Sequence, residues 1–278
     1  MKNNECKIVL FSDLHYAPER PVNNGSIIGR KLTDLALPLL EKLIQKINNE
    51  IKPDIVFSLG DFIEDFNDKE KDLENLDFIW KKLSEIKTPF YSAVGNHDLR
   101  SMDARFEVEK IFNGGGYNKS TFSLNFNGYH FVILSTDIDP DKGREFGGIL
   151  KVNFISKKEI EWLKNDLKTN KLPCIIFTHF GIAEDEMKGN WWFEKNPSHG
   201  LLGNRNELKE ILKQDKNLIA VFSGHQHWTK HYIEDGISYF VLGSLSENML
   251  DDGIPDGVFY EINLSGKNIS ILEKRIRI

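Results

Sequence analysis

The chain has 278 residues, of which 40% are hydrophobic and 28% are charged, and its formal net charge is −6. This length and balance indicate a globular protein with one large α/β domain, or at most two modest ones. No block of Lys or Arg stands apart from acidic neighbours, which argues against a surface that binds a nucleic-acid duplex, since such surfaces need clustered positive charge.

Cysteines and apolar runs narrow the class of protein further. Cys6 and Cys174 each lie beside an apolar run. We interpret them as small core residues and not as a disulfide or a metal-binding pair. The N-terminal apolar run is too short for a signal peptide, and no segment approaches the roughly 18 apolar residues of a membrane span. We therefore expect a cytoplasmic protein that makes no use of a membrane.

Short apolar runs alternate with longer amphipathic segments along about two-thirds of the chain, which indicates repeated β-α units. The predicted strands are the Val/Ile/Phe-rich runs at 7–11, 54–59, 89–94, 131–136, 174–178 and 218–223. Their uninterrupted apolar character is typical of strands that are covered on both faces.

Apolar residues at helical spacing predict helices between these strands. The two clearest stripes are Leu35, Leu39, Leu43, Ile44 and Ile47, and then Leu73, Leu76, Trp80 and Leu83. Two further helices are predicted to begin at capping boxes, one formed by Ser156 with Glu159 and the other by Asn204 with Glu207. We expect the apolar faces of these helices to pack on the sheets.

The final third of the chain is richer in hairpin signals than the rest. Predicted turns lie at Asn127-Gly128, Asp235-Gly236 and Ser265-Gly266. Such pairs between strand-like runs are typical of antiparallel hairpins, so the sheets should be mixed. No internal repeat or linker divides the sequence, and residues 1–278 are predicted to form a single domain.

Five of the apolar runs are followed at once by side chains that bind metals or move protons. In chain order these are Asp13 with His15, Asp61, then Asn96 with His97 and Asp98, then His179, and finally His225 with His227. Ligands of open α/β sheets bind beyond the carboxyl ends of strands, so these side chains are expected to converge in one crevice. Each motif alone is as typical of a turn as of a site, but five in succession predict a site.

The chemistry of these residues points to two metal ions. The candidate ligands are Asp13, His15, Asp61, Asn96, His179, His225 and His227. Imidazole, carboxylate and amide donors without thiolate suit Mn, Fe, Zn or Ni. Seven donors exceed what one ion with an open position needs, and Asp61 is the natural bridge between two. Two divalent ions would leave residual positive charge that favours a phosphate and a metal-bridging hydroxide, as in two-metal hydrolysis.

The motifs D-x-H, G-D, G-N-H-D, T-H and G-H-x-H, taken together, resemble those of the calcineurin-like metallophosphoesterase superfamily, from about Asp13 to His227. The resemblance implies a four-layer α/β/β/α sandwich, in which two mixed β-sheets are flanked by helices. It also implies two divalent or mixed-valence transition-metal ions, with Mn²⁺ and Fe favoured and Zn²⁺ or Ni²⁺ as alternatives.

The resemblance further implies a role for each residue. One ion would be held by Asp13, His15, Asp61 and His227, and the other by Asp61, Asn96, His179 and His225. His97 would hydrogen-bond the phosphate or protonate the leaving oxygen, and Asp98 would fix the orientation of His97.

Flanking residues favour some branches of the superfamily over others. Glu64 stands where purple acid phosphatases carry a tyrosine, so a tyrosinate–Fe(III) site is not expected. The segment GLLGNRNELKEIL resembles one in bacterial cyclic-nucleotide phosphodiesterases and manganese-dependent ADP-ribose/CDP-alcohol diphosphatases. We therefore predict hydrolysis of phosphodiester or pyrophosphate bonds in a small phosphorylated substrate, with a nucleotide as the first candidate. A phosphomonoesterase and a non-catalytic binding platform are the alternatives.

A long loop is predicted at 181–205, after the His179 motif. Its residues Trp191, Trp192 and Phe193 could stack on a nucleobase or form a small core within the loop, and the sequence leaves both open. His130 and His231 are not assigned to the site, whereas His199 either faces the site or lies at the surface, with the surface favoured. Residues 113–120 are predicted to be a flexible loop, and Arg100 and Arg144 are candidates to meet a second phosphate. The oligomeric state is not fixed by the sequence.

Overall fold

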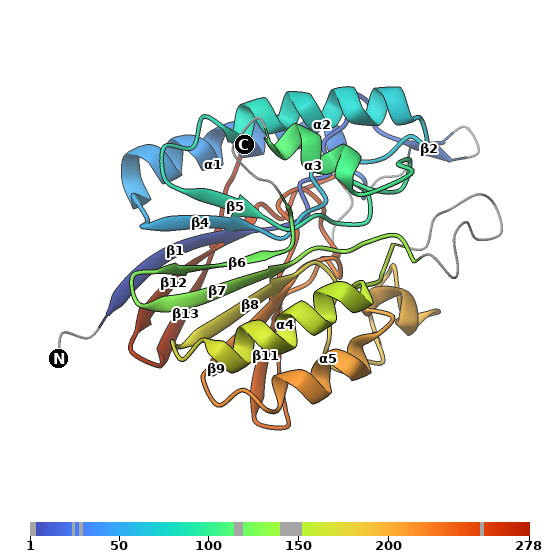
Figure 1. Ribbon diagram of the computed structural model, residues 1–278. Helices are drawn as coiled ribbons and strands as arrows, with labels where there is room; N and C mark the ends of the chain where they lie inside the picture. The colour runs from blue at the N-terminus through green and yellow to red at the C-terminus, as the bar shows by residue number, and fades with distance from the viewer. Residues whose placement is uncertain (1–3, 24–25, 28–29, 114–118, 140–151, 251–252) are drawn as a thin grey trace.

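Two β-sheets lie face to face, and helices cover the outer side of each (Figure 1). This computed structural model describes residues 4–23, 26–27, 30–113, 119–139, 152–250 and 253–278. The predicted α/β/β/α sandwich with two mixed sheets is confirmed. Arg144 and most of the predicted loop at 113–120 lie outside the described residues.

The first sheet consists of β1 (Glu5–Phe11), β4 (Ile55–Ser58), β5 (Phe90–Ser92), β12 (Val258–Ser265) and β13 (Asn268–Arg275), in the order β13-β12-β1-β4-β5. The second sheet consists of β6 (Phe122–Phe126), β7 (Tyr129–Leu134), β8 (Cys174–Thr178), β9 (Leu218–Ser223), β10 (Lys230–Glu234) and β11 (Ile237–Val241), in the order β10-β11-β9-β8-β7-β6. A short hairpin pairs β2 (Val22–Asn23) with β3 (Ser26–Ile27).

The longer helices are α1 (Thr33–Lys46), α2 (Lys69–Leu83), α3 (Phe106–Asn113), α4 (Lys157–Thr169) and α5 (Arg205–Leu212). A π-helical turn at Ile47–Ile51 extends α1, and a 3-10 turn lies at Pro197–Gly200. In Figure 1, α1, α2 and α3 lie over the first sheet, and α4 and α5 lie over the second. Among the described residues, no helix combines the length and apolar character that a bilayer crossing requires.

Apolar side chains fill the three spaces between the four layers. Leu39, Leu43 and Ile79 of the upper helices are buried against the first sheet. Phe57, Phe131, Phe177 and Phe222 are buried between the two sheets. Ile160, Leu163, Leu208 and Leu212 of the lower helices are buried against the second sheet. Burial on both faces explains why the central strands read as uninterrupted apolar runs.

Strand direction determines where the site forms. In the first sheet, β1 runs parallel to β4, and β4 runs parallel to β5. In the second, β7, β8 and β9 are also mutually parallel. The carboxyl ends of the strands within each parallel set therefore meet at one edge, where the polar motifs follow them.

Most of the predicted local signals are confirmed, and one is wrong. The three hairpins form, and Ser156 caps α4 in a reciprocal box with Glu159. Asn204 makes no such box, because its side chain bonds instead to the backbone N–H and carbonyl of Ile155. Asn204 thus ties the start of α5 to the segment before α4. Both cysteines are buried and free, as expected.

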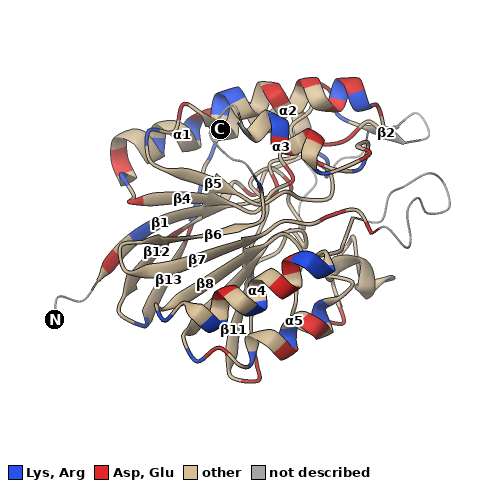
Figure 2. Ribbon diagram, viewed as in Figure 1, with Lys and Arg blue, Asp and Glu red and all other residues tan. Residues whose placement is uncertain are grey.

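Charged side chains lie mainly on the helices and loops, while the strands between the layers are largely uncharged (Figure 2). Lys/Arg and Asp/Glu positions alternate along α1, α2, α4 and α5 in that view.

Candidate metal centre

The structure brings all seven predicted ligands together beyond the strand ends. Asp13 and His15 follow β1, Asp61 follows β4, and His179 follows β8. Among the described residues, four three-residue groups are close enough to hold an ion, and two of them consist only of predicted ligands: Asp13, His15 and His227, and Asp61, His179 and His225. The members of both groups are buried, so their charged and polar atoms face one another and not bulk water.

The backbone at the ligand positions adopts an unusual conformation. Five of the ligands have positive φ angles: Asp13 (58°), His15 (49°), Asp61 (54°), His225 (65°) and His227 (54°). Non-glycine residues seldom adopt this left-handed region, which costs on the order of 1–3 kcal/mol per residue and is concentrated at functional sites. The left-handed turns redirect the chain directly after each strand and bring the side chains onto one another.

Two glycines of the motifs are required by close packing. A Cβ atom at Gly95 would overlap Asp61 Oδ1, and one at Gly224 would overlap Ser12 Oγ. The backbone of each glycine passes directly against a residue of the centre. The glycine of GNHD is therefore needed for this approach, because a larger residue would push the Asp61 carboxylate away.

The first ligand set consists of Asp13, His15 and His227, and each of its two imidazoles contacts a carboxylate through Nδ1. Glu64 Oε2 lies 3.0 Å from His15 Nδ1, and Glu247 Oε2 lies 2.7 Å from His227 Nδ1. With its proton on Nδ1, each imidazole donates to its carboxylate and leaves Nε2 as an acceptor. The two Nε2 atoms lie 3.1 Å apart, and that of His227 is 3.2 Å from Asp13 Oδ1. Acceptors facing one another at this distance fit a shared cation.

The second ligand set consists of Asn96, His179 and His225, and here the imidazoles contact backbone carbonyls instead of carboxylates. His179 Nδ1 donates to the carbonyl of Leu59 at 2.8 Å, so its Nε2 faces Asn96 Oδ1 at 3.0 Å as a second acceptor. His225 Nε2 donates to the carbonyl of His199 at 3.0 Å, which leaves His225 Nδ1 for a ligand. These donors also fit a cation.

Asp61 lies between the two sets. Its Oδ1 accepts a hydrogen bond from the backbone N–H of His97 at 2.8 Å. Its Oδ2 is buried and has no hydrogen-bond donor among the described residues. This oxygen lies 3.2 Å from His179 Nε2 and 3.7 Å from His15 Nε2. An unpartnered buried carboxylate oxygen beside both sets fits the bridging position that the sequence predicts.

Neighbouring charges shift the pKa of groups in the site. Burial opposes the charge of Asp61, but His179 and other imidazoles outweigh it and hold the carboxyl pKa well below its usual range. Burial also opposes the charge of Lys31, but Glu247 and Glu64 outweigh it and raise the ammonium pKa. Asp61 is therefore ionised and Lys31 protonated at neutral pH.

Asp98 does not orient His97, so this part of the prediction is wrong. The Asp98 carboxylate accepts hydrogen bonds from the backbone N–H groups of Asp61, Phe62 and Gly95 at 2.8–3.0 Å. Those bonds clamp the turn after β4 to the turn after β5. The carboxylate beside His97 belongs to Asp65, whose Oδ1 lies 2.6 Å from His97 Nδ1. Arg100 also pairs with Asp65, at 3.3 Å.

Comparison with known proteins agrees with this geometry. The sequence profile described as calcineurin-like phosphoesterase matches residues 6–229. The chain belongs to this family.

Relatives of this phosphoesterase include a probable cyclic nucleotide phosphodiesterase of Xenorhabdus bovienii (strain SS-2004), which is 24% identical over 178 residues. That match spans 62% of this chain and 62% of the relative's length. Among solved structures, a dimetal phosphatase from Danio rerio superposes with a TM-score of 0.67 at 14% identity, covering 96% of this chain and 98% of that one. A protein from Thermus thermophilus gives a TM-score of 0.60 at 15% identity, with the same two coverages. These likenesses at low identity show a shared fold.

Four residues around the phosphoesterase site were missed by sequence reasoning: Lys31, Glu64, Asp65 and Glu247. Glu64 served in the sequence only to exclude a tyrosinate, although it follows Asp61 by three positions. Glu247 follows β11, so extending the search for polar residues to a sixth strand end would have found it. Lys31 lies in the segment before α1, and no sequence motif around it indicates a role in the site.

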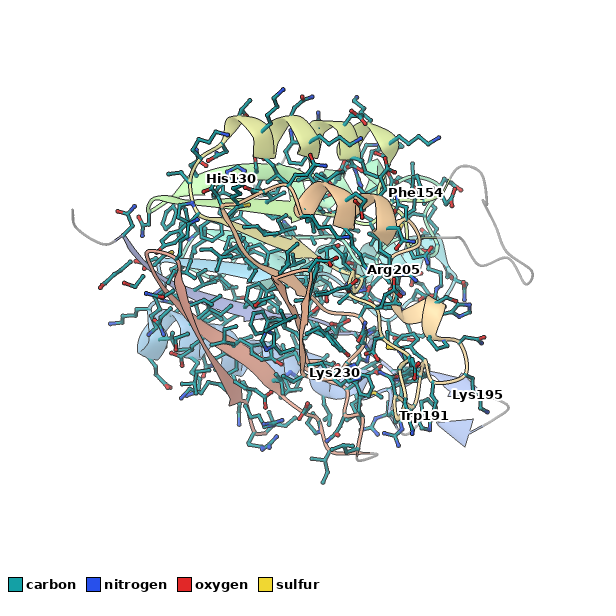
Figure 3. All side chains as sticks on the ribbon, turned by 90° about the horizontal axis from the view of Figure 1, so that it is seen from below. His130, Phe154, Trp191, Lys195, Arg205 and Lys230 are labelled. Atoms are coloured by element: carbon teal, nitrogen blue, oxygen red, sulfur yellow. The ribbon has the colours of Figure 1, made fainter. Side chains whose placement is uncertain are left out.

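The loop at 181–205 contacts the site through its backbone and aromatic rings. The Phe193 ring lies 4.9 Å from that of His225, and the His199 carbonyl accepts from His225 while the His199 side chain is exposed. Trp191 is 56% exposed, so it is not part of a closed loop core. Figure 3 shows Trp191 and Lys195 at the periphery, well apart from His130.

Proposed function

We propose that this phosphoesterase is a two-metal hydrolase of phosphodiester or pyrophosphate bonds in a small, nucleotide-like molecule. The observation that carries the proposal is the convergence of two acceptor sets on the single unpartnered oxygen of Asp61. The likeness to the probable cyclic nucleotide phosphodiesterase of Xenorhabdus supports a diester of a nucleotide over a monoester. Mn²⁺ and Fe are the proposed ions, because imidazole, carboxylate and amide donors without thiolate suit them.

Bound ions would supply the positive charge that polarises a phosphoryl oxygen and lowers the pKa of water. Asp13, His15 and His227 would hold one ion, Asn96, His179 and His225 would hold the other, and Asp61 would contact both. His97 stands beside these sets, with Nδ1 against Asp65 and its side chain 11% exposed. Its Nε2 is therefore the atom available to donate a proton to the leaving oxygen.

A substrate panel tests the bond type. Purified protein with added Mn²⁺ would be assayed on p-nitrophenyl phosphate, bis-p-nitrophenyl phosphate, cyclic nucleotides and nucleoside diphosphate esters. We expect kcat/KM for at least one diester or pyrophosphate to exceed that for the monoester by about tenfold or more, a difference of about 1.4 kcal/mol in transition-state binding. A preference for the monoester would replace this proposal with the phosphomonoesterase alternative.

The binding-platform alternative predicts a different result in the same panel. All predicted ligands and His97 are present in the chain, so a non-catalytic role has no missing group to explain it. Failure to hydrolyse every substrate with Mn²⁺, Fe²⁺, Zn²⁺ or Ni²⁺ would favour that alternative.

A further inference from the structure

Lys31 connects the two carboxylates that hold the histidines of the first ligand set. Its Nζ lies 2.8 Å from Glu64 Oε2 and 2.8 Å from Glu247 Oε1. Glu64 in turn contacts His15 Nδ1, and Glu247 contacts His227 Nδ1. One ammonium group therefore lies at the centre of a chain of contacts that ends at both imidazoles.

This network is closed to water. Lys31 is 7% exposed, Glu64 is 7% exposed and Glu247 is 1% exposed. The ring of Trp192 covers the lysine, with its centroid 5.0 Å from Nζ. Two buried carboxylates this close repel each other strongly unless a cation lies between them, and removing one partner of such a cluster is costly. Lys31 is the cation that lies between the two glutamates.

The second ligand set does not rely on such a network. His179 and His225 donate to the backbone carbonyls of Leu59 and His199. A carbonyl is neutral and held by the fold, so it needs no counter-ion to stay in place. Loss of the lysine charge should therefore disturb one ligand set and leave the other intact.

We propose that Lys31 is a positioning residue of the metal centre, which holds Glu64 and Glu247 so that His15 and His227 present Nε2 to one ion. This inference rests on the proposed two-metal function. Without the ammonium group, both glutamates would lose the partner that holds their carboxylates in place, and the histidines that they contact would lose their fixed direction. Outer partners of this kind contribute about 10- to 100-fold to metal affinity.

Lys209 offers a matched control elsewhere in the chain. It is 6% exposed, and its Nζ also joins two carboxylates, those of Glu184 at 2.9 Å and Glu234 at 2.8 Å. Within the described part of the chain, neither glutamate bonds to a predicted ligand. K31M and K209M each remove a buried ammonium group that joins two carboxylates, and only K31M removes it beside the metal centre. The carboxylates of the control are more exposed, at 53% and 32% against 9% and 1% for those of Lys31.

The test is a Mn²⁺ titration of the full chain after chelation, followed by calorimetry and by the spectrum of bound Mn²⁺ in electron paramagnetic resonance. We expect wild type and K209M to bind two Mn²⁺ alike. K31M should lose about 10- to 100-fold in affinity for one Mn²⁺ and keep the other, with circular dichroism unchanged. If K31M does not fold, E247Q removes one contact to Lys31 and should weaken the same ion.

Each other outcome overturns the inference. Wild-type affinity for both ions in K31M or E247Q would show that the lysine does not position the ligands. Equal weakening in K31M and K209M would show a general loosening of the protein. Failure of the proposed function is distinguishable, because wild type would then bind two Mn²⁺ without hydrolysing a phosphoester, or would not bind two Mn²⁺ at all.

Discussion

His97 and Asp98 are neighbours in the sequence, but their side chains serve different contacts. Asp98 accepts from three backbone N–H groups, while His97 lies against Asp65. The sequence allowed the strand-end residues to be assigned as ligands, because strand ends of a parallel sheet meet. The partner of His97 could not be assigned from the sequence, because the contact with Asp65 depends on how two turns fold against each other.

Substitution of His97 tests its proposed role. H97A should keep both metal ions, since the residue is not among the seven ligands, and should lower kcat by about 10²- to 10⁴-fold through loss of the general acid. D65N should lower kcat in the same direction by a smaller factor, because His97 would remain but lose its ion pair. Metal content by mass spectrometry and single-turnover rates would measure both effects. Loss of a metal ion in H97A would contradict this role.

Substitution of Asp98 should act on stability, in contrast to substitution of His97, which should act on catalysis. In D98N, one amide N–H₂ group would face backbone N–H groups that the carboxylate now satisfies. The principal effect should therefore be a lower free energy of unfolding, because donors buried without partners cost about 1–3 kcal/mol each.

The largely buried Arg105, which directly precedes α3, connects this helix to elements of the other half of the sandwich. The Arg105 guanidinium pairs with Glu159 of α4 and donates to the carbonyls of Ser135 and Thr136 at 3.3 Å each. The Arg105 and Glu159 side chains are each 13% exposed. This contact links the helix layer of the first sheet to that of the second. The sequence showed Glu159 only as a capping residue, because the arginine lies 54 positions away.

Removal of this arginine should destabilise the fold in a pH-dependent way. R105M leaves the largely buried carboxylate of Glu159 with its hydrogen bonds from Ser156 but without its cation, so the free energy of unfolding at pH 7 should fall by about 3 kcal/mol. Burial opposes the charge of Glu159, but Arg105 outweighs it and lowers the pKa of this carboxyl from its ordinary 4.5. A lowered folded-state pKa contributes stability that is present above the ordinary value and lost as pH falls through the folded one. The difference between wild type and R105M should therefore shrink below about pH 4.5.

Urea unfolding at several pH values would measure this difference. K164M, on the exposed face of α4, is the control, because Lys164 pairs with Glu161 at the surface with side chains 40% and 65% exposed. Ion pairs at the surface contribute little because water and salt screen them, so K164M should change stability little. A constant difference between R105M and wild type from pH 7 to pH 3 would contradict the account.

The whole molecule is organised so that two sheets present their strand ends at a common site. The apolar runs, the helix stripes and the three hairpins were all readable from the sequence, because period and turn chemistry are local. The capping box at Asn204 was misread, since its side chain bonds to a distant backbone. The single-domain organisation of the chain stays a prediction. The buried network around Lys31 was not readable, because its members are brought together only by the folded layers.

Reconstitution with metal tests the central claim most directly. Chelated protein would be given increasing equivalents of Mn²⁺ and assayed on bis-p-nitrophenyl phosphate, with D61A alongside as the variant that lacks the proposed bridge. We predict no hydrolysis without metal, a rise in rate that stops at two Mn²⁺ per chain, and neither tight binding nor activity in D61A. Full activity in the chelated protein, or wild-type activity in D61A, would contradict the two-metal account.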